Sequence, residues 1–267
     1  MEENSLAIRA THAHLWGPHS QTWRINRESI LIAGGARALL LQLAHPAVAA
    51  GVDQHSNFKA ERYKRLFRTL WLMSQIIYGR EAVRQQAART INRRHQPVRG
   101  AVESSGAAYR ANDPVLGWWV LATLIDSSLM GYERWVQPLT DAEHDQYYEE
   151  CKALAAVFGI QPKHMPADYT AYRAWFDDTL TNGTLAYDDV NRRLAREIFA
   201  LPWPLRQIAY GLTMTITPAP VREGFGFEWD AEQAAPWQRF EVGLSAWYRR
   251  MPGPLRYNKL VWLVRML

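Results

Sequence analysis

Cysteine is almost absent from this chain, since Cys151 is the only one among 267 residues. A single thiol excludes an internal disulfide framework, a multi-cysteine zinc site and an iron–sulfur cluster held by cysteines. A reducing compartment is compatible with this composition.

Long apolar runs are also lacking, and no leader sequence is expected. Residues 1–24 are polar and contain no apolar core followed by a small-residue cleavage site, so a secretory signal is not expected. The most apolar stretch, residues 30–52, is interrupted by Gly34, Arg37 and His45 among others, whereas a membrane span needs about 20 largely apolar residues. We therefore expect a buried helix there, no integral membrane span, and a cytoplasmic protein.

The chain has no block of basic residues, although its net charge is +5 and its pI is near 9.4. The arginines are scattered along the expected helices, so nucleic-acid binding has little support. A generally positive field would suit acidic ligands, including the carboxylates of a cofactor.

Aromatic residues, in contrast, are plentiful, with 12 Trp and 12 Tyr. Such large aromatic surfaces need burial or a ligand. The length of 267 residues is near the upper limit for one hydrophobic core. We therefore predict a single domain over residues 1–267, in which residues 1–28 form an N-terminal extension that can be mobile.

Helix signals dominate the sequence, and strand signatures are nearly absent. We predict an all-α fold, a single-domain bundle of about eight to ten helices. The expected helices cover residues 29–43, 59–78, 81–95, 113–132, 140–158, 168–180, 188–199, 205–215, 236–251 and 255–267.

Local signals set several of these boundaries. Ser29 and Asp113 are predicted N-caps, and Thr140 with Glu143 matches a capping box. Pro46 either begins a new helix or kinks the preceding one.

Two groups of histidines are weighed first as ligands. His12, His14 and His19 could offer imidazoles to a metal, but no carboxylate lies in register with them and a short N-terminal segment is often mobile, which favours no metal. His45 and His55 flank an apolar stretch, where a buried imidazole without a hydrogen bond costs about 1 to 3 kcal/mol. Two interpretations of this pair stay equally open: histidines that are hydrogen-bonded in the core, and histidines that line a ligand pocket.

His95 differs because it lies at the end of a strongly periodic helix, beside the break made by Pro97 and Gly100. That break allows the ring to project into a cavity, and a neutral imidazole is a common ligand of haem iron. From spacing alone, an ordinary solvated histidine at a helix end is the favoured interpretation.

Arg68 and Thr69 follow Arg65 by three and four residues, which places all three on one face of the preceding helix. Two cations and a hydroxyl could pair with carboxylates there, and haem propionates are one such partner. The alternative is a solvated basic face, since Arg62 and Lys64 are close by.

An ordered set of motifs runs through the chain. It comprises Gly34-Gly35-x-Arg37-x(4)-Gln42-Leu43-Ala44-His45-Pro46, Gly51-Val52, His55-Ser56, Arg65-Leu66-x-Arg68-Thr69, Tyr78-Gly79, Asn92-x-x-His95-x-x-Val98-x-Gly100, Tyr109-x-Ala111-x-Asp113-Pro114, Trp119-Val120-x-Ala122-Thr123-Leu124 and Thr217-Pro218-x-x-Val221-Arg222-x-Gly224-Phe225. In order and spacing this set resembles the catalytic domain shared by MpaB-type oxygenases and latex-clearing rubber oxygenases.

The resemblance implies an extended globin-like helical fold, haem b as cofactor, and oxidative cleavage of carbon–carbon double bonds in isoprenoid chains. By position, His95 resembles the proximal ligand of the haem iron, which makes it the favoured metal ligand. Arg65-x-x-Arg68-Thr69 resembles the Arg-x-x-Lys-Thr element beside the haem of rubber oxygenases.

The chain departs from the rubber oxygenases at two places. Arg68 replaces a lysine, and a guanidinium is a far poorer iron ligand, so a lysine-capped resting state is not expected. The glutamate that rubber oxygenases have upstream is missing from residues 47–53, and His45, Asp53 or His55 is expected in that distal space.

These inferences combine into a haem-dependent oxygenase for a small apolar, isoprenoid-like substrate and dioxygen. His95, Arg65, Arg68 and Thr69 are the predicted cofactor-binding residues, and His45, Arg68 and Thr69 the predicted catalytic ones. Residues 118–129 are expected to surround the substrate. The alternatives are a haem-binding carrier, sensor or peroxidase-like protein without oxygenase turnover, and a metal-free helical interaction protein.

Overall fold

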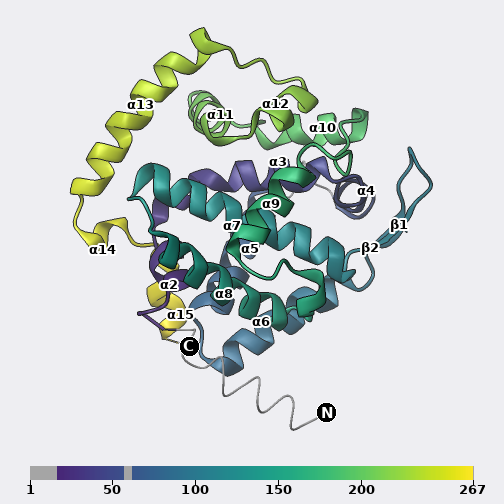
Figure 1. Cartoon of the computed structure of the whole chain (residues 1–267), viewed down its shortest axis with the longest axis horizontal. Coiled ribbons are helices and arrows are strands. Elements are labelled where there is room, and N and C mark those ends of the chain that lie inside the picture. Colours follow the sequence, from purple (N-terminus) through teal and green to yellow (C-terminus); the bar gives the residue numbers. More distant parts are fainter. Residues whose placement is uncertain (1–16, 57–61, 267) are drawn as a thin grey trace.

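The structure, a computed structural model, describes residues 17–56 and 62–266 of the chain. Within that part the chain forms 14 α-helices, α2 to α15, and one two-stranded sheet (Figure 1). The predicted all-α class is confirmed. The helices outnumber the about eight to ten expected because several, such as α14 (Gly253–Arg256), have only one or two turns.

The central element is α7 (Pro114–Trp135), which begins as predicted at Asp113. The Asp113 carboxylate accepts hydrogen bonds from the N–H groups of Val115 and Leu116. Helices α3, α8 and α13 pack around α7 (Figure 1). Their bounds are Gly35–Ala44 for α3, Asp141–Val157 for α8 and Ala231–Arg250 for α13.

By length and composition α7 could cross a membrane, and the bent pair made by residues 29–44 and 46–55 passes the same test together. In the structure, 61% of the most apolar window of α7 is buried inside the protein. This helix therefore forms the core of the domain.

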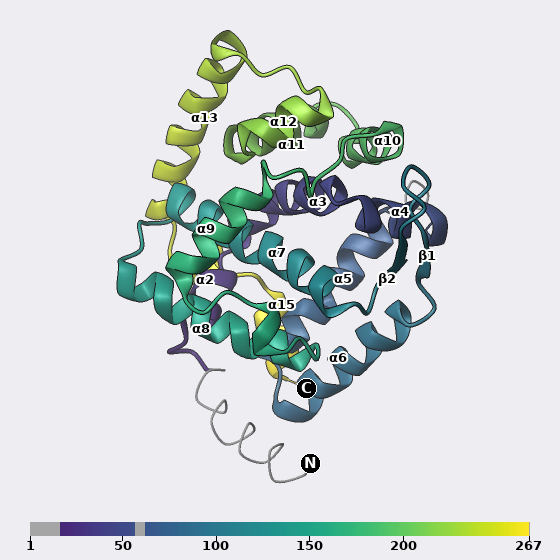
Figure 2. The ribbon, with the colours of Figure 1, turned by 45° about the vertical axis from the view of Figure 1, so that its right-hand side comes forward.

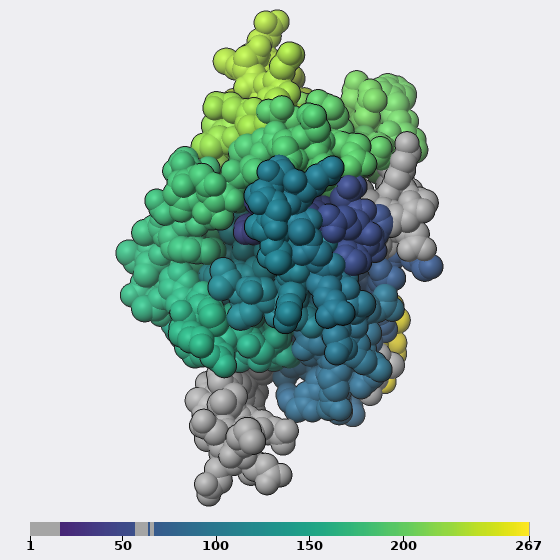
Figure 3. Space-filling model, turned by 90° about the vertical axis from the view of Figure 1, so that its right-hand side faces the viewer, coloured from purple at the N-terminus to yellow at the C-terminus, as the bar shows by residue number. Residues whose placement is uncertain are grey.

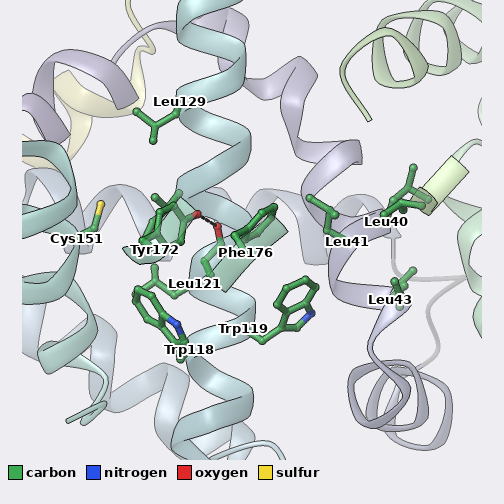
Figure 4. Close-up of a cluster of buried hydrophobic side chains, with 14 of the residues drawn as sticks. Leu40, Leu41, Leu43, Trp118, Trp119, Leu121, Leu129, Cys151, Tyr172 and Phe176 are labelled. Atoms are coloured by element: carbon green, nitrogen blue, oxygen red, sulfur yellow. Dashed lines mark hydrogen bonds between the residues drawn. The ribbon is translucent and has the colours of Figure 1, made fainter. Parts of the chain in front are cut away.

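Aromatic side chains fill the space between α7 and α9 (Tyr169–Thr179). Figure 4 shows Trp118 and Trp119 of α7 beside Tyr172 and Phe176 of α9, and the Trp119 and Phe176 rings stack at 5.7 Å between centroids. The Tyr172 hydroxyl donates to the carbonyl oxygen of Ala122 at 2.9 Å. Much of the aromatic surface noted in the sequence is thus buried in the core.

The N-terminal part contains short elements. Helix α2 (Gln21–Asn26) lies within the expected N-terminal extension, and the N–H of Gln21 donates to the buried carboxylate of Glu150 on α8. Residues 29–34 form a 3-10 turn before α3, and the expected Ser29 cap is wrong because Glu28 precedes this turn without a side-chain hydrogen bond. Pro46 begins a new helix, α4 (Pro46–His55), which settles that alternative.

Helices α5 (Arg62–Tyr78) and α6 (Glu81–His95) form a hairpin (Figure 2). The predicted bounds of α6 are confirmed. Arg84 closes the connection, since its guanidinium donates to the carbonyl oxygens of Ile76 at 2.8 Å and Gly79 at 3.0 Å. The Ile76 carbonyl belongs to the last turn of α5 and Gly79 directly follows that helix, so a side chain of α6 caps the C-terminal end of α5.

A small antiparallel sheet follows, where the sequence predicted no strand. Strands β1 (Arg99–Ala101) and β2 (Ala108–Arg110) pair with Gly100 opposite Tyr109. Figure 3 shows this hairpin on the surface, in front of α4. Tertiary contacts explain it: the Tyr109 hydroxyl donates to Oε1 of Gln54 on α4 at 2.7 Å, and a Cβ on Gly100 would lie 2.5 Å from that same oxygen.

The C-terminal half departs from the expected boundaries at two places. Helix α13 begins at Ala231 rather than Pro236, because Asp230 and Gln233 form a capping box. The single helix expected over residues 255–267 is wrong, because α14 and α15 (Leu260–Arg265) are separated at Asn258, whose N–H donates to the carbonyl oxygen of Arg27 at 2.7 Å.

The remaining helices in this half are α10 (Asp189–Ile198), α11 (Leu205–Ile216) and α12 (Ala219–Phe225). In Figures 1 and 2, α11, α12 and α13 lie at the opposite end of the molecule from α6.

Candidate functional site

The hairpin of α5 and α6 carries four of the predicted site residues. Its closed end is at Gly79, so the beginning of α5 and the end of α6 form its open end. At 1.5 Å per residue, the backbones of Arg65 and His95 are each about 20 Å from the connection, measured along their own helices. Arg68 and Thr69 lie about one turn closer to it. The hairpin therefore brings these predicted residues to one end, although the Arg65 side chain lies outside the described part.

Burial changes along this hairpin. Near the connection, Ile76, Ile77 and Tyr78 of α5 and Ala87 and Ala88 of α6 are buried. Toward the open end, Arg68 is half-buried, while Thr69 and His95 are exposed. Any group bound at the open end would thus meet accessible side chains, and would not have to displace a packed core.

His95 ends α6, as predicted, and its carbonyl oxygen accepts a hydrogen bond from the N–H of Val98 at 3.0 Å. Nearby, the Asn112 amide donates to the carbonyl oxygen of Asn92 at 3.3 Å, which ties this end of α6 to the loop before α7. The backbone under the imidazole is therefore held on both sides. The predicted role of His95 as an iron ligand stays a prediction.

His45 is the N-cap of α4. Its Nδ1 accepts a hydrogen bond from the N–H of Ala47 at 3.2 Å, so the ring proton of the neutral imidazole resides on Nε2. Burial lowers the pKa of His45 below its usual value, which keeps this ring neutral near pH 7. His45 thus has a structural role through one nitrogen and carries a hydrogen-bond donor on the other.

The ring of His45 lies 6.4 Å from that of Trp119, measured between centroids. Trp119 is 3% exposed, and within the part of the chain that the structure describes its indole N–H has no hydrogen-bond partner. A buried donor without a partner is costly. The rings of His45 and Trp119 thus bring two N–H groups near each other between α4 and α7.

The other two candidates for the distal space are engaged elsewhere. His55 Nε2 lies 3.0 Å from the carbonyl oxygen of Arg99 on β1, and Asp53 forms an ion pair at 3.0 Å with Arg193 on α10. These contacts hold the β-hairpin and α10 against α4. The side-chain hydrogen bond of His45, in contrast, is made within its own helix, with the N–H of Ala47.

The N-terminal histidines fall largely outside the described part, since His12 and His14 precede residue 17. His19 is exposed. Among residues 17–56 and 62–266, no group of three or more His, Cys, Asp or Glu side chains gathers as a metal-binding cluster.

Most side chains of residues 118–129 are buried in the core. Trp118, Leu121 and Ala122 are at most 4% exposed. Val120, Leu124 and Ser128 are half-buried, and Val120 and Leu124 are the apolar members of this stretch that a substrate could contact.

A buried charged network escaped the sequence reasoning. The Arg37 guanidinium on α3 pairs with the carboxylate of Asp126 on α7, donates to Ser127 Oγ at 2.8 Å and to the Ile216 carbonyl oxygen at 2.7 Å, and Arg173 on α9 also pairs with Asp126. A signal for it was present, because Arg37 and Asp126 are charged residues inside two apolar helices. The network joins four helices and so serves the architecture rather than the chemistry.

These features define the class of the protein: a helical domain built on a buried α7, with a helical hairpin that presents histidine and arginine at its open end. A sequence model described as the catalytic domain of ER-bound oxygenase mpaB/B′ and rubber oxygenase matches residues 22–247. The chain belongs to this family of oxygenase catalytic domains. No curated protein and no solved structure matches the chain.

Proposed function

We propose that this chain is a haem b-dependent oxygenase that uses dioxygen to oxidise a small apolar, isoprenoid-like substrate, with His95 as the iron ligand. The observation that carries the proposal is the open end of the α5–α6 hairpin, where His95, Arg68 and Thr69 lie on the two helices in a chain of this family. When bound, haem supplies the activation of dioxygen, which no side chain provides.

The donor set fits this group chemically. His95 offers an imidazole on an exposed helix end, and the guanidinium of Arg68 is suited to bidentate contact with a propionate carboxylate. Thr69 adds a hydroxyl that can donate or accept. The sole cysteine, Cys151, is 1% exposed and lies in the core, which leaves histidine as the suitable ligand on the hairpin.

In this proposal His45 is a neutral donor. Its Nε2–H would hydrogen-bond to an oxygen atom in the site, while its Nδ1 keeps the ring fixed on the first turn of α4. Half-buried apolar side chains that pack against the core, such as Val48, Leu72 and Ile91, would exclude water from the substrate.

The first experiment is an absorption spectrum of the protein expressed with added haem precursor. We expect a Soret band that His95→Ala weakens or shifts, because the variant loses its imidazole ligand. His19→Ala is the matched control, since His19 is also exposed but lies far along the chain from the hairpin. Circular dichroism would establish that both variants fold. A spectrum unchanged by His95→Ala would refute the ligand assignment.

A second measurement separates the oxygenase from a haem carrier, sensor or peroxidase-like protein. Dioxygen uptake and product analysis with an added isoprenoid should show consumption coupled to a cleaved or oxygenated product. A haem-loaded protein without such turnover would support the alternative, and a colourless protein would support neither.

A further inference from the structure

A cavity of about 430 Å³, widely open to solvent, lies between α11 and the beginning of α13. It is lined by Tyr210, Glu228, Trp229, Gln233, Pro236 and Trp237. Figures 1 and 2 place these helices at the opposite end of the molecule from α6, so the cavity is separate from the hairpin site. Its volume is within the range of small-molecule sites, about 300 to 1,000 Å³.

The aromatic rings of this cavity are held in place by the fold. Trp237 lies directly on α11 at Gly211, where a Cβ would come within 2.1 Å of the indole. The Tyr210 ring packs at 5.2 Å from Phe199 and at 6.2 Å from Trp229, between centroids. Rings fixed before a ligand arrives lose little conformational entropy on binding.

The charged residue in the cavity lining is the acidic Glu228, although the chain as a whole carries a net charge of +5. Residues 223–232 contain four carboxylates and no Lys or Arg. Glu228 is exposed at the cavity and forms no ion pair with any side chain in the described part. Asp230, in contrast, is occupied as the cap of α13.

The nearest basic residue in the sequence is engaged elsewhere. Arg222 donates from its guanidinium to the carbonyl oxygens of Met214, at 3.2 Å, and Thr217. It therefore does not neutralise Glu228 through an ion pair.

We propose that this cavity binds an organic cation, of the quaternary ammonium or alkylated amine class. The faces of aromatic rings attract such weakly hydrated cations, and the Glu228 carboxylate supplies the opposite charge. A hard metal ion fits less well, because Ca²⁺ takes 6 to 8 oxygen ligands and Glu228 is the only carboxylate of the lining. The same ammonium chemistry occurs in free choline and in the phosphatidylcholine headgroup.

The test is a titration of the full chain with choline, followed by calorimetry and tryptophan fluorescence at constant ionic strength. The neutral carbon isostere 3,3-dimethylbutan-1-ol serves as the charge control. We expect choline to bind and the isostere to bind at least about tenfold more weakly, since it has the shape without the charge. Glu228→Gln should weaken choline about threefold to tenfold, because it keeps the shape of the lining and removes its charge.

Trp229→Ala should also weaken choline, whereas Trp262→Ala on α15, an exposed tryptophan away from the cavity, should not. Vesicles distinguish the source: retention on phosphatidylcholine vesicles that Glu228→Gln abolishes would assign a lipid headgroup, and binding of free choline alone would assign a soluble ligand. Equal binding of choline and the isostere, no binding of either choline or phosphatidylcholine, or no effect of Glu228→Gln would each overturn the proposal.

Discussion

At the start of α4, the His45 imidazole has the position that Ser, Thr, Asp or Asn usually occupies at a helix N-terminus. An imidazole can accept there only while Nδ1 is unprotonated. A protonated ring would lose the hydrogen bond to Ala47 and would place a positive charge at the positive end of the helix dipole. The structural and the proposed chemical roles of His45 therefore both require the neutral form.

This dependence predicts an effect of pH on stability. Burial lowers the pKa of His45 in the folded chain, so the unfolded chain takes up the proton more readily as the pH falls. The stabilising contribution of His45 is thus complete above about pH 6.5, the usual histidine value, and declines as the pH falls below it. His45→Asn keeps a cap acceptor and does not titrate.

The predicted loss of stability at low pH can be measured by urea unfolding of the wild type and His45→Asn from pH 8 to pH 5. The stability of the wild type relative to the variant should fall on acidification. A difference that stays constant over this range would contradict it. At pH 8, His45→Ala should cost about 1 kcal/mol through the lost cap.

Gly100 makes a second prediction at the scale of single residues. Ala at this position would place its Cβ 2.5 Å from Gln54 Oε1 and 3.0 Å from the Tyr109 hydroxyl, so Gly100→Ala should destabilise the chain by about 1 to 3 kcal/mol. Gly35→Ala is the control, because its Cβ would meet nothing within 4 Å and α3 would gain up to about 1 kcal/mol. Thermal unfolding measures both, and an equal effect of the two changes would show that the contact at Gly100 is unimportant.

At the scale of elements, the α5–α6 hairpin depends on Arg84. This side chain is 5% exposed and makes bonds to two carbonyls at the end of α5. Burial lowers its pKa, and the neighbouring Glu81 carboxylate opposes that shift. A side chain of α6 thus caps the C-terminal end of α5, which joins the two helices of the hairpin into one unit.

Arg84→Met should therefore lower the free energy of unfolding by about 1 to 3 kcal/mol for each carbonyl left buried without a donor. Arg89→Met on the same helix is the control, because Arg89 is exposed and bonds to the side chain of Gln85, and its effect should stay within about 0.5 kcal/mol. Hydrogen exchange should locate the loss at residues 74–79. Equal losses in the two variants would exclude a specific capping role.

The same scale shows which elements could be predicted. Boundaries set by neighbouring residues were predictable, such as the Asp113 cap and the Thr140–Glu143 capping box. The β-hairpin was not, because Gly100 and Tyr109 pair through contacts with Gln54 on a distant helix. The start of α13 is also visible in the sequence, because Asp230 and Gln233 have the spacing of a capping box, whereas Pro236 lies inside the helix.

For the whole molecule, the buried ion network determines how four helices meet. Arg37 and Asp126 have side chains only 2% and 3% exposed, so their charges are withdrawn from water and depend on each other. Removing one partner leaves the other charge uncompensated, which costs about 3 to 5 kcal/mol.

Asp126→Asn should show a loss of that size in urea unfolding. Asp177→Asn provides a matched control, because Asp177 also pairs with Arg173 but is 60% exposed, and its loss should stay below about 1 kcal/mol. Comparable losses of unfolding free energy at both positions would mean that the buried network does not hold the four helices together.

The candidate site was predictable in part. The position of His95 at a helix end followed from local pattern, and the family followed from motifs in order. The contacts of His55 with β1 and of Asp53 with α10 could not be predicted, because these partners lie about 40 to 140 residues away in the chain. Pairings at such separations are decided by packing, which a single sequence does not reveal.

The open end of the α5–α6 hairpin also bears on how the protein withstands proteolysis in a cell. Its turns near Thr69 and His95 are exposed, and local opening of exposed turns gives proteases access to a folded chain. A cofactor bound across them adds its binding free energy to the folded state alone. The supply of that cofactor would then set the lifetime of the chain as well as its activity.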